Sequence, residues 1–536
     1  MRTDCIPFSE LPHSSRLFLD FLANSPKLKP FYPRNVHFRE WIADEASSLS
    51  YDSLRRKQVS DALELQNQNL GSSPKTFANI QRLREGAFTV VTGQQVGLFG
   101  GPLFAILKAI SAVKIAAETT AMGIECVPVF WLATEDHDLA EVSHATVLGA
   151  DGNLHRLRTN AAGKNDAPVG NIVFNDEISV VVDELANLLG SSPVTEFLKE
   201  SYRPGENFGS AFGKLFARVF ADWGVILLDP KDDVLHRIAK PVFEAAVVQG
   251  SEINRKLLQR GQELESAGYE EQVKVTPSSS LLFAFEDGHR HPIRHSGEKF
   301  SFGGHELSAE ELKSSVSEHP EHFSANVLLR PVMEDFLLPN LAYIGGPAEI
   351  AYFAQVAVVY EQILGRITPV LSRYSATIIE PRQANLLRKY QLSFGDLLHG
   401  SEHLAEVLAS HTLDGNLIRK FEEAASQVDT SMKAITGSLQ QLDPTLVDAA
   451  EKAQAKMQYQ IEQLQGRAAR AQARRTDEVK RHAELLSSGL YPEKTLQERE
   501  VAGIYFVARH GLDFLHTLYN AVQTDCTGHH VLYLES

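Results

Sequence analysis

Cysteine is scarce in this chain of 536 residues, which has only Cys5, Cys126 and Cys526. Three thiols this far apart in the sequence predict neither a disulfide framework nor a thiolate metal site, and they are typical of a reducing compartment. Long apolar runs are also missing, because charge or glycine interrupts each one before the ~20 residues that span a bilayer. The opening MRTDCIPFSELPHSSR lacks the apolar segment of a secretory signal. We therefore expect a cytoplasmic protein with no membrane partner.

Basic residues are outnumbered, with 52 Lys and Arg against 68 Asp and Glu, for a net charge of −16. Binding to phosphate backbones needs clustered cations, so nucleic acid is not an expected partner. Small anionic substrates remain compatible, since they need only a few well-placed Lys or Arg side chains. The 43% hydrophobic and 22% charged composition is typical of a folded globular protein.

Alternating strand and helix patterns predict the fold class. Residues 88–92 and 127–132 are apolar, strand-like runs, and an amphipathic helix is expected between them from about Pro102. A further apolar, strand-like run lies at 225–228, and the alternation of strand and helix patterns resumes after about 325. This order of elements predicts an α/β protein with a Rossmann-like parallel-sheet core.

The same patterns suggest three regions. The core is expected at 1–383, with a helical N-terminal part and two inserted segments at about 150–205 and 250–325; the second contains a hairpin around Asp287-Gly288. Residues 384–490 are predicted to form an antiparallel α-helical coiled-coil arm. Residues 491–536 are expected to be helical and to return to the core.

The arm is predicted from apolar residues that recur at steps of four and three on both sides of a break at Asp443-Pro444. The positions before the break are Leu417, Phe421, Ala424, Val428, Met432, Ile435, Leu439 and Leu442. Those after it are Leu446, Ala450, Ala453, Met457, Ile461, Leu464, Ala468 and Ala471. A coiled-coil arm of this kind indicates a homodimer contact; the alternative is a hairpin packed on its own domain.

A glycine-rich loop between the first strand and its helix is the strongest local signal for a ligand site. Ligands bind at the carboxyl ends of parallel strands, and glycines let backbone N–H groups approach an anion. The substrate-binding candidates here are Thr92, Gly93, Gln94, Gln95, Gly97 and Gly101. Lys108, further along the helix, is a catalytic candidate. The alternatives are a turn that simply needs small residues and a solvated lysine.

Glu135-Asp136-His137-Asp138 follows the next strand and places carboxylates around an imidazole. This combination suits acid/base work or amine binding, so we predict Asp136 and His137 as catalytic residues and Glu135 and Asp138 as substrate-binding residues. One histidine among carboxylates is a weak metal signal, and no metal ligand is predicted. The alternative is an acidic helix cap.

A third polar block, beginning at Glu334-Asp335, repeats the order of strand, glycine turn and helix, and it would face the same crevice. Its substrate-binding candidates are Tyr343, Gly345, Gly346, Glu349 and Tyr352, joined by Arg373 as an anion clamp. A separate nucleotide pocket is predicted from Arg388, Lys389, Gln497, Arg499 and Tyr505. The alternative for that last group is a salt-bridged clasp between domains.

These blocks, VTGQQVGLFGGPLFAILKAI, VPVFWLATEDHDLAEV, GGPAEIAYFAQ and YPEKTLQERE, resemble in order and position the BshC family, the cysteine ligases of bacillithiol synthesis. The resemblance covers essentially the whole chain. It implies a Rossmann core related to class I aminoacyl-tRNA synthetases and nucleotidyltransferases, two connective insertions and a coiled coil that dimerises. No HIGH or KMSKS signature is present.

The resemblance also implies an activity, the addition of cysteine to the amine of glucosaminyl-malate in the last step of bacillithiol synthesis. ATP or ADP is expected as a cosubstrate and no cofactor as tightly bound. Two other functions stay open: a nucleotidyltransferase-type enzyme acting on another small anionic substrate, and a noncatalytic coiled-coil scaffold that senses a ligand.

Overall fold

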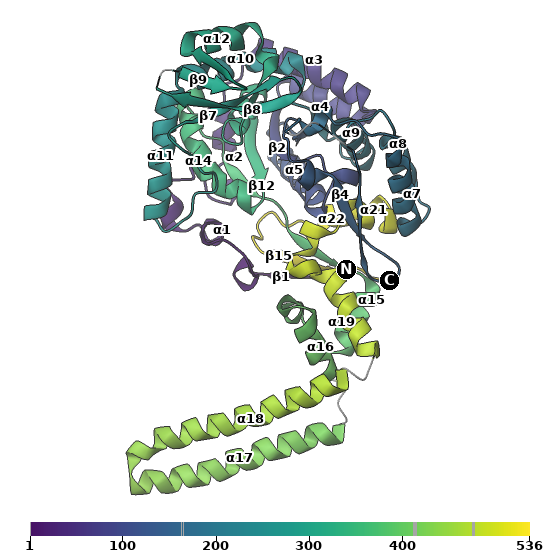
Figure 1. The fold of residues 1–536 in the computed structure, drawn as a ribbon, viewed down its shortest axis with the longest axis vertical. Helices are drawn as coiled ribbons and strands as arrows, with labels where there is room; N and C mark the ends of the chain where they lie inside the picture. The colour runs from purple at the N-terminus through teal and green to yellow at the C-terminus, as the bar shows by residue number, and fades with distance from the viewer. Residues whose placement is uncertain are drawn as a thin grey trace.

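A computed structural model describes residues 2–161, 163, 166–297, 299–410, 415–473 and 477–535. Figure 1 shows a large α/β body from which one long helical arm projects. Within these residues, no helix is both long and apolar enough to cross a membrane.

A five-stranded parallel sheet forms the centre of the body, in the order β13-β12-β2-β3-β6. Its strands are β2 (Phe88–Gln94), β3 (Cys126–Leu132), β6 (Ile226–Leu228), β12 (Asn340–Gly345) and β13 (Val370–Ser372). Every residue of β3 is buried, as expected for a strand covered by helices on both faces. The predicted parallel α/β core is confirmed.

Helices follow the strands as the sequence pattern predicts. After β2 the chain turns through Gly100 and Gly101, whose φ angles of 89° and 70° suit glycine, and enters α5 (Leu103–Ala121) with Pro102 as its N-cap. α14 (Pro347–Leu364) follows β12 in the same way. On the N-terminal side, α3 (Ser53–Asn69) and α4 (Pro74–Glu85) complete the expected helical region.

The first inserted segment, predicted at about 150–205, has regular structure. β4 (His144–Leu148) pairs with β5 (Leu154–Arg158), and α7 (Glu177–Leu189) and α8 (Pro193–Ser201) follow. α7 buries Ile178, Val182 and Leu185 on one face. Residues 162, 164 and 165 lie outside the described part.

The second inserted segment forms its own antiparallel sheet, in the order β10-β9-β8-β7-β11. The strands are β7 (Ser279–Glu286), β8 (His289–Ser296), β9 (Lys299–Phe302), β10 (His305–Ser308) and β11 (Phe323–Ala325), with α11 (Gly250–Ser266) before them and α12 (Ala309–Glu318) before β11. The predicted hairpin at Asp287-Gly288 is confirmed, because Glu286 pairs with His289 across it. α13 (Arg330–Leu337) then leads back to the central sheet.

The arm consists of α17 (Gly415–Leu442) and α18 (Val447–Ala473), which pack against each other on either side of the predicted break at Pro444. Its base is built from α15 (Pro381–Lys389), α16 (Ser401–Ser410) and α19 (Asp477–Leu490). Of the predicted apolar series, Met432 and Ala450 are buried, whereas Leu442 is 77% exposed. Residues 411–414 and 474–476 of the predicted arm lie outside the described part.

Both chain ends meet in a three-stranded sheet that the sequence pattern does not predict. β15 (His529–Tyr533) lies between β1 (Arg2–Ile6) and β14 (Ala376–Ile379). Before it, α20 (Gln497–Glu500), α21 (Gly503–His510) and α22 (Asp513–Ala521) pack against the body. The C-terminal segment is therefore helical in its first part and ends in a strand.

Candidate active site

A cavity of about 640 Å³ lies at the carboxyl end of the central sheet, between the ends of β2 and β12. From β2 the chain builds the sheet outward through β3 and β6, and it returns to the other side of β2 for β12 and β13. The strand order therefore reverses at this point, which is where open α/β sheets bind ligands. Gln95, His137 and Tyr343, one from each of the three predicted blocks, all line this cavity.

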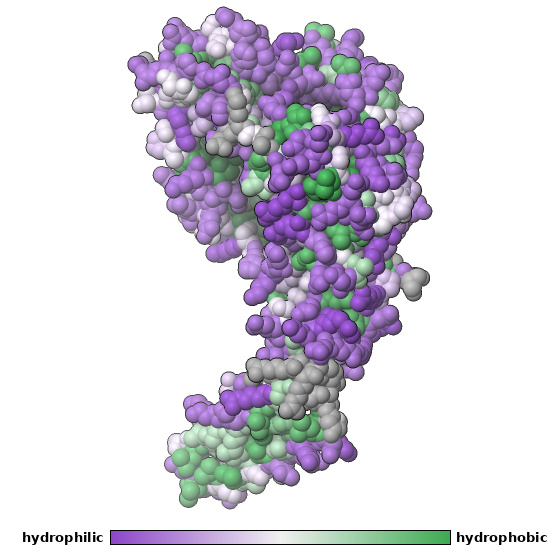
Figure 2. Space-filling model, turned by 45° about the vertical axis from the view of Figure 1, so that its right-hand side comes forward, coloured by the Kyte–Doolittle hydropathy of each residue, from purple (hydrophilic) through white to green (hydrophobic). Residues whose placement is uncertain are grey.

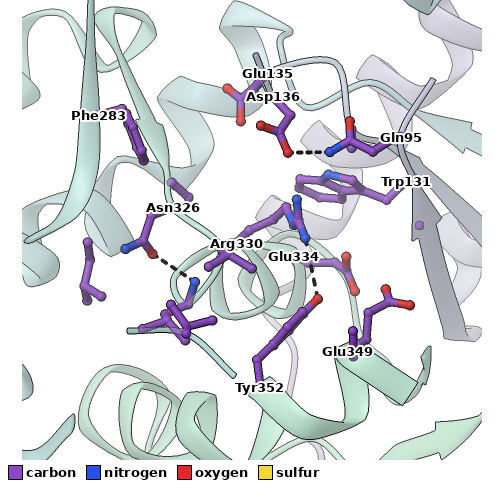
Figure 3. A pocket seen from close by; sticks show the side chains of 18 of the residues that line it. Gln95, Trp131, Glu135, Asp136, Phe283, Asn326, Arg330, Glu334, Glu349 and Tyr352 are labelled. Carbon is purple, nitrogen blue, oxygen red and sulfur yellow. Dashed lines mark hydrogen bonds between the residues drawn. The ribbon is translucent and has the colours of Figure 1, made fainter. Parts of the chain in front are cut away.

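The second inserted sheet closes the opposite side of the cavity. Residues of β7 and β8, among them Phe283 and Arg290, contribute to its wall together with Asn326 from the following loop. In Figure 3, Phe283 lies across the cavity from Gln95 and Asp136. The site is thus shared between the core and an insertion, as expected for a pocket that must exclude water around a reaction.

Lys108 and Glu349 join the two glycine turns through a buried ion pair. Lys108 Nζ lies 2.5 Å from Glu349 and also donates to the Gly93 carbonyl at 2.7 Å and to Gln94 at 2.9 Å. Glu349 in turn accepts from the Gly346 N–H and from the Tyr343 hydroxyl, at 2.8 and 2.6 Å. Burial lowers the pKa of the Lys108 ammonium, and Glu349 opposes that shift. This lysine therefore supports the cavity wall more than it offers a free cation.

Asp136 is a second acid of the cavity with several partners. It accepts hydrogen bonds from the Gln95 amide and, at 2.8 Å, from the His137 backbone N–H. Arg290 lies 3.7 Å from Asp136 and 3.3 Å from His137 Nδ1, and its guanidinium is fixed by Ser324 and the Ala325 carbonyl. Burial tends to raise the pKa of Asp136, but the positive charge of Arg290 and Arg330 outweighs it and holds that pKa below its ordinary value. Asp136 is therefore ionised at neutral pH, which suits it to hold a cationic amine.

Arg330 and Glu334 lie four residues apart on α13 and line the cavity. Glu334 begins the third predicted polar block but was given no role there, and the site prediction omits Arg330. Figure 3 shows Arg330 in the middle of the site, on the same helix as Glu334 and next to Tyr352, whose hydroxyl lies 3.5 Å away. A spacing of four places both side chains on one helix face, which is the signal that could have found them. Their neighbours come from segments distant in sequence, so only the fold shows that this face lines the site.

Glu334 is almost fully buried, and its Oε1 makes no hydrogen bond within the described part of the chain. Burial, reinforced by the charge of Asp335, raises the pKa of this carboxyl well above its ordinary value. This shift favours the protonated form of Glu334, which can donate a hydrogen bond or a proton into the cavity.

We expect Glu334→Gln to remove one pH dependence of stability. A carboxyl whose folded-state pKa is raised binds more protons when folded than when unfolded, so its contribution to stability falls as pH rises above about 4.3. Glutamine resembles the protonated carboxyl and does not ionise, so its contribution to stability does not fall as the pH rises. Urea unfolding between pH 5 and pH 8 should show a smaller decline for the variant. Equal declines would show that Glu334 ionises normally in the folded protein.

Two further arginines, Arg373 and Arg499, line the cavity and come from segments later in the chain. Arg373 follows β13, but its guanidinium forms a buried ion pair with Glu498 at 2.6 Å and donates to the Tyr374 carbonyl at 2.9 Å. Arg499, predicted for a nucleotide pocket, instead lines this same cavity. Within the described residues, Arg499 has no carboxylate within ion-pair distance, so it offers more free charge to an anion than Arg373.

Three of the predicted ligand residues have other local partners, and two predicted glycines shape a turn. The Thr92 hydroxyl donates to the Ile344 carbonyl within the sheet, and Asp138 caps α6 (Leu139–Val142) by accepting from the Glu141 N–H. Glu135 reaches the cavity but pairs with His236 at 2.7 Å. Gly97 lies so close to Gly101 that a Cβ on it would come within 3.0 Å of the Gly101 Cα. Gly97 and Gly101 therefore shape the turn, and neither lines the cavity.

The remaining residues predicted for a nucleotide pocket do not gather in one place. Gln497 is buried and holds the Ile378 backbone through its side-chain amide, and Tyr505 donates to Glu380 at 3.0 Å. Lys389 pairs with Glu478 at 2.9 Å on the surface. Arg388 lines a second cavity, of about 1200 Å³, at the base of the arm.

Comparison with known proteins identifies the relatives of this chain. Residues 1–374 match the model of the N-terminal Rossmann-like domain of bacillithiol biosynthesis BshC, and residues 376–534 match that of the BshC C-terminal coiled-coil domain. A protein of Koribacter versatilis is 51% identical over 99% of this chain and 100% of its own length. Proteins of Solibacter usitatus and Salinibacter ruber are 35% and 31% identical, over 99% and 96% of this chain and 100% and 96% of their own. All three are named as candidate cysteine ligases BshC.

Among solved structures, one titled as a candidate arginyl-tRNA synthetase from Campylobacter jejuni aligns with 87% of this chain and 98% of its own, at 11% identity. Its TM-score of 0.21 is too low to indicate a shared fold. The predicted relation to class I synthetases therefore stays a prediction.

Proposed function

Because this chain belongs to the BshC family of bacillithiol biosynthesis, we propose that it is a ligase that joins the carboxyl of cysteine to the amine of glucosaminyl-malate. The observation that supports the proposal is one cavity at the point where the strand order of the sheet reverses. Gln95, Asp136, His137 and Tyr343 all line it. Such convergence of polar groups is what a ligase needs and what a scaffold does not require.

The chemistry sets the demands on the site. A free carboxylate does not form an amide in water unless it is first activated, either as an acyl-adenylate or as an acyl phosphate, so ATP is the proposed cosubstrate. The attacking amine must be neutral. We assign Asp136 to hold the ammonium form of the amine and His137, beside it, to take one proton from it, so that the neutral amine can attack the activated carboxyl; the second proton leaves the nitrogen with the departing AMP or phosphate. Arg290 contacts both and keeps the two side chains in place.

Anionic groups of the substrates are assigned to Arg330 and Arg499. Both line the cavity and neither has an ion-pair partner within the described part of the chain, whereas Lys108 and Arg373 are already paired. Glucosaminyl-malate carries two carboxylates, and guanidinium groups bind carboxylates with well-defined geometry.

Arg330→Met is expected to raise the KM for glucosaminyl-malate by about ten- to a hundredfold, because a charge-assisted hydrogen bond contributes roughly 1.5–3 kcal/mol. Its effect on kcat should be much smaller. Steady-state kinetics with the second substrate saturating would measure the two constants separately. A fall in kcat at unchanged KM would remove Arg330 from substrate binding and place it with the reacting groups.

The direct test is to incubate the pure protein with cysteine, glucosaminyl-malate and ATP and to follow the amide product by mass spectrometry. A nucleotidyltransferase acting on another small anion would consume ATP without forming this product. A ligand sensor would bind one of the compounds in a calorimetric titration and convert none. Either outcome would overturn the ligase proposal.

We further propose that the hairpin of α17 and α18 acts as a coiled coil that joins two copies of the chain. Figure 2 shows an apolar surface gathered on the arm. Ile435, Leu442, Met457 and Leu464 of the predicted apolar series are 48%, 77%, 47% and 58% exposed in the single chain. An apolar stripe this exposed is typical of a surface covered by a partner.

Changing Leu442 and Leu464 together to glutamate is therefore expected to turn a dimer into a monomer, as measured by light scattering. Leu54→Glu is the matched control, since Leu54 is 63% exposed on α3 and should leave the dimer unchanged. A dimer that survives the double change would assign the interface to another surface.

A further inference from the structure

The sheet that joins the two chain ends also brings two cysteines together. Cys5 lies on β1 and Cys526 in the turn that precedes β15, and their Sγ atoms are 2.7 Å apart although 521 positions separate them in the sequence. The register of β1 on β15 sets Cys5 opposite His530, and directly opposite residues project from the same face of a sheet. One ligand atom from each of Cys5, Cys526 and His530 lies within 4.8 Å of the other two.

His530 is the unusual member of this group. It is 1% exposed, and neither of its ring nitrogens makes a hydrogen bond of good geometry within the described part of the chain, although weaker interactions with the backbone of Ser375 and Gly528 partly oppose the lowering of its pKa by burial. One face of the ring is covered by Tyr374, with the ring centroids 4.4 Å apart. The neighbouring His529, by contrast, is bonded to the Ser375 and Thr377 hydroxyls at 2.8 and 2.9 Å. Buried polar atoms without partners are rare, because they cost folding free energy, so we expect a ring nitrogen of His530 to bind a ligand.

We propose that Cys5, Cys526 and His530 bind a zinc ion, with water in the fourth coordination position. Two thiolates and an imidazole are ligands that Zn²⁺ prefers, and a Zn–S distance of about 2.3 Å at tetrahedral angles sets two sulfurs about 3.8 Å apart. The ion would therefore widen the present sulfur contact by about 1 Å, which a small rotation of the exposed Cys5 side chain supplies. Gly528 leaves the required space, because a Cβ there would come within 2.4 Å of Cys5 Sγ.

The ion has a structural role that does not depend on the proposed function. It ties the first strand to the turn before the last one, in the sheet that also contains β14. The Ser375 hydroxyl and the Ala376 N–H, at the start of β14, bond to Glu498, the partner of Arg373 on the cavity wall. Zinc at this position would hold the chain ends against the segment that supports the site.

The test is the metal content of full-length protein, purified with a reductant and without chelator, measured by mass spectrometry of the elements. We expect close to one Zn²⁺ per chain, and loss of most of it in Cys5→Ser, Cys526→Ser and His530→Gln. Cys126→Ala is the matched control, since Cys126 lies in β3, and it should keep the metal. Exchange of Zn²⁺ for Co²⁺ should produce the absorption band of a cobalt–thiolate bond in the wild type and not in Cys5→Ser.

Three results would overturn the proposal. One is wild-type protein that binds no Zn²⁺ when titrated with the metal; another is metal that persists in all three variants. The third is metal-free protein in which Cys5 and Cys526 resist alkylation until reduced, which would identify a disulfide. Should His530→Gln fail to fold, Cys5→Ser still decides the question, because Cys5 is exposed on an edge strand and its change to serine does not disturb the core.

Discussion

Asp136→Asn is expected to lower kcat/KM for amide formation by about 10²- to 10⁴-fold, the range typical of a group that assists proton transfer. Asparagine keeps the shape of the side chain, and its single Oδ1 can still accept from the His137 N–H, while its NH₂ group takes the place of the oxygen that accepts from Gln95. It removes the negative charge that faces Arg290 at 3.7 Å and that we assign to hold the amine. The measurement is the initial rate of product formation, followed by mass spectrometry at several substrate concentrations.

A matched control separates this effect from a general loss of folded protein. Asp183→Asn makes the same change at an exposed position on α7 and should leave the rate within about twofold of the wild type, as expected for a surface substitution. Thermal unfolding of both variants would show whether the fold is intact. If Asp136→Asn folds normally and turns over at the wild-type rate, the amine does not bind at Asp136.

The central sheet and its two glycine turns were predictable because their signals are local. Strand β3 is a continuous apolar run, and Pro102 and Pro347 mark the starts of the two helices that follow glycine turns. That Gln95, His137 and Tyr343 meet also follows from a general rule, since parallel strands end at the same edge of a sheet.

Arg290, Arg330 and the environment of Glu334 were harder to predict, because they depend on contacts distant in sequence. Arg290 comes from an inserted sheet, and only the folded insertion shows that it reaches Asp136 and His137. Glu334 begins the third predicted polar block, but nothing in the local sequence shows that Arg330, one turn earlier on the same amphipathic helix, also lines the cavity. The strands at the two chain ends are short, and β1 and β15 pair residues more than 500 positions apart.

Residues 496–499, with the sequence LQER, show why polar residues can mislead a sequence-based prediction. Its combination of amide, carboxylate and guanidinium indicated a nucleotide site. In the structure, Gln497 and Glu498 are both buried and bonded to the backbone and side chains around β14. Such residues look like ligand contacts in the sequence because a buried polar network needs the same chemical groups. Of this segment, only Arg499 lines the cavity.

Glu498→Ala is expected to destabilise the protein by roughly 3–5 kcal/mol, because it leaves a buried guanidinium without its partner. Glu498 is 1% exposed and accepts from Arg373 at 2.6 Å, from the Ser375 hydroxyl at 2.9 Å and from the Ala376 N–H at 2.9 Å. Glu484→Ala, at an exposed position on α19, is the control and should cost less than about 0.5 kcal/mol. The free energy of unfolding in urea measures both.

The pH dependence and a double variant show whether the ion pair causes this loss. Burial tends to raise the pKa of Glu498, but Arg373 and the hydrogen bonds outweigh it and lower that pKa. A carboxyl with a lowered folded-state pKa stabilises the protein above its unfolded pKa of about 4.3, and that contribution is lost as pH falls through the folded value. The difference in free energy of unfolding between wild type and Glu498→Ala should therefore become smaller as the pH is lowered.

The double variant Arg373→Met, Glu498→Ala should lose at least about 0.5 kcal/mol less stability than the sum of the losses in the two single variants. A strictly additive loss would mean that the two side chains stabilise the fold independently.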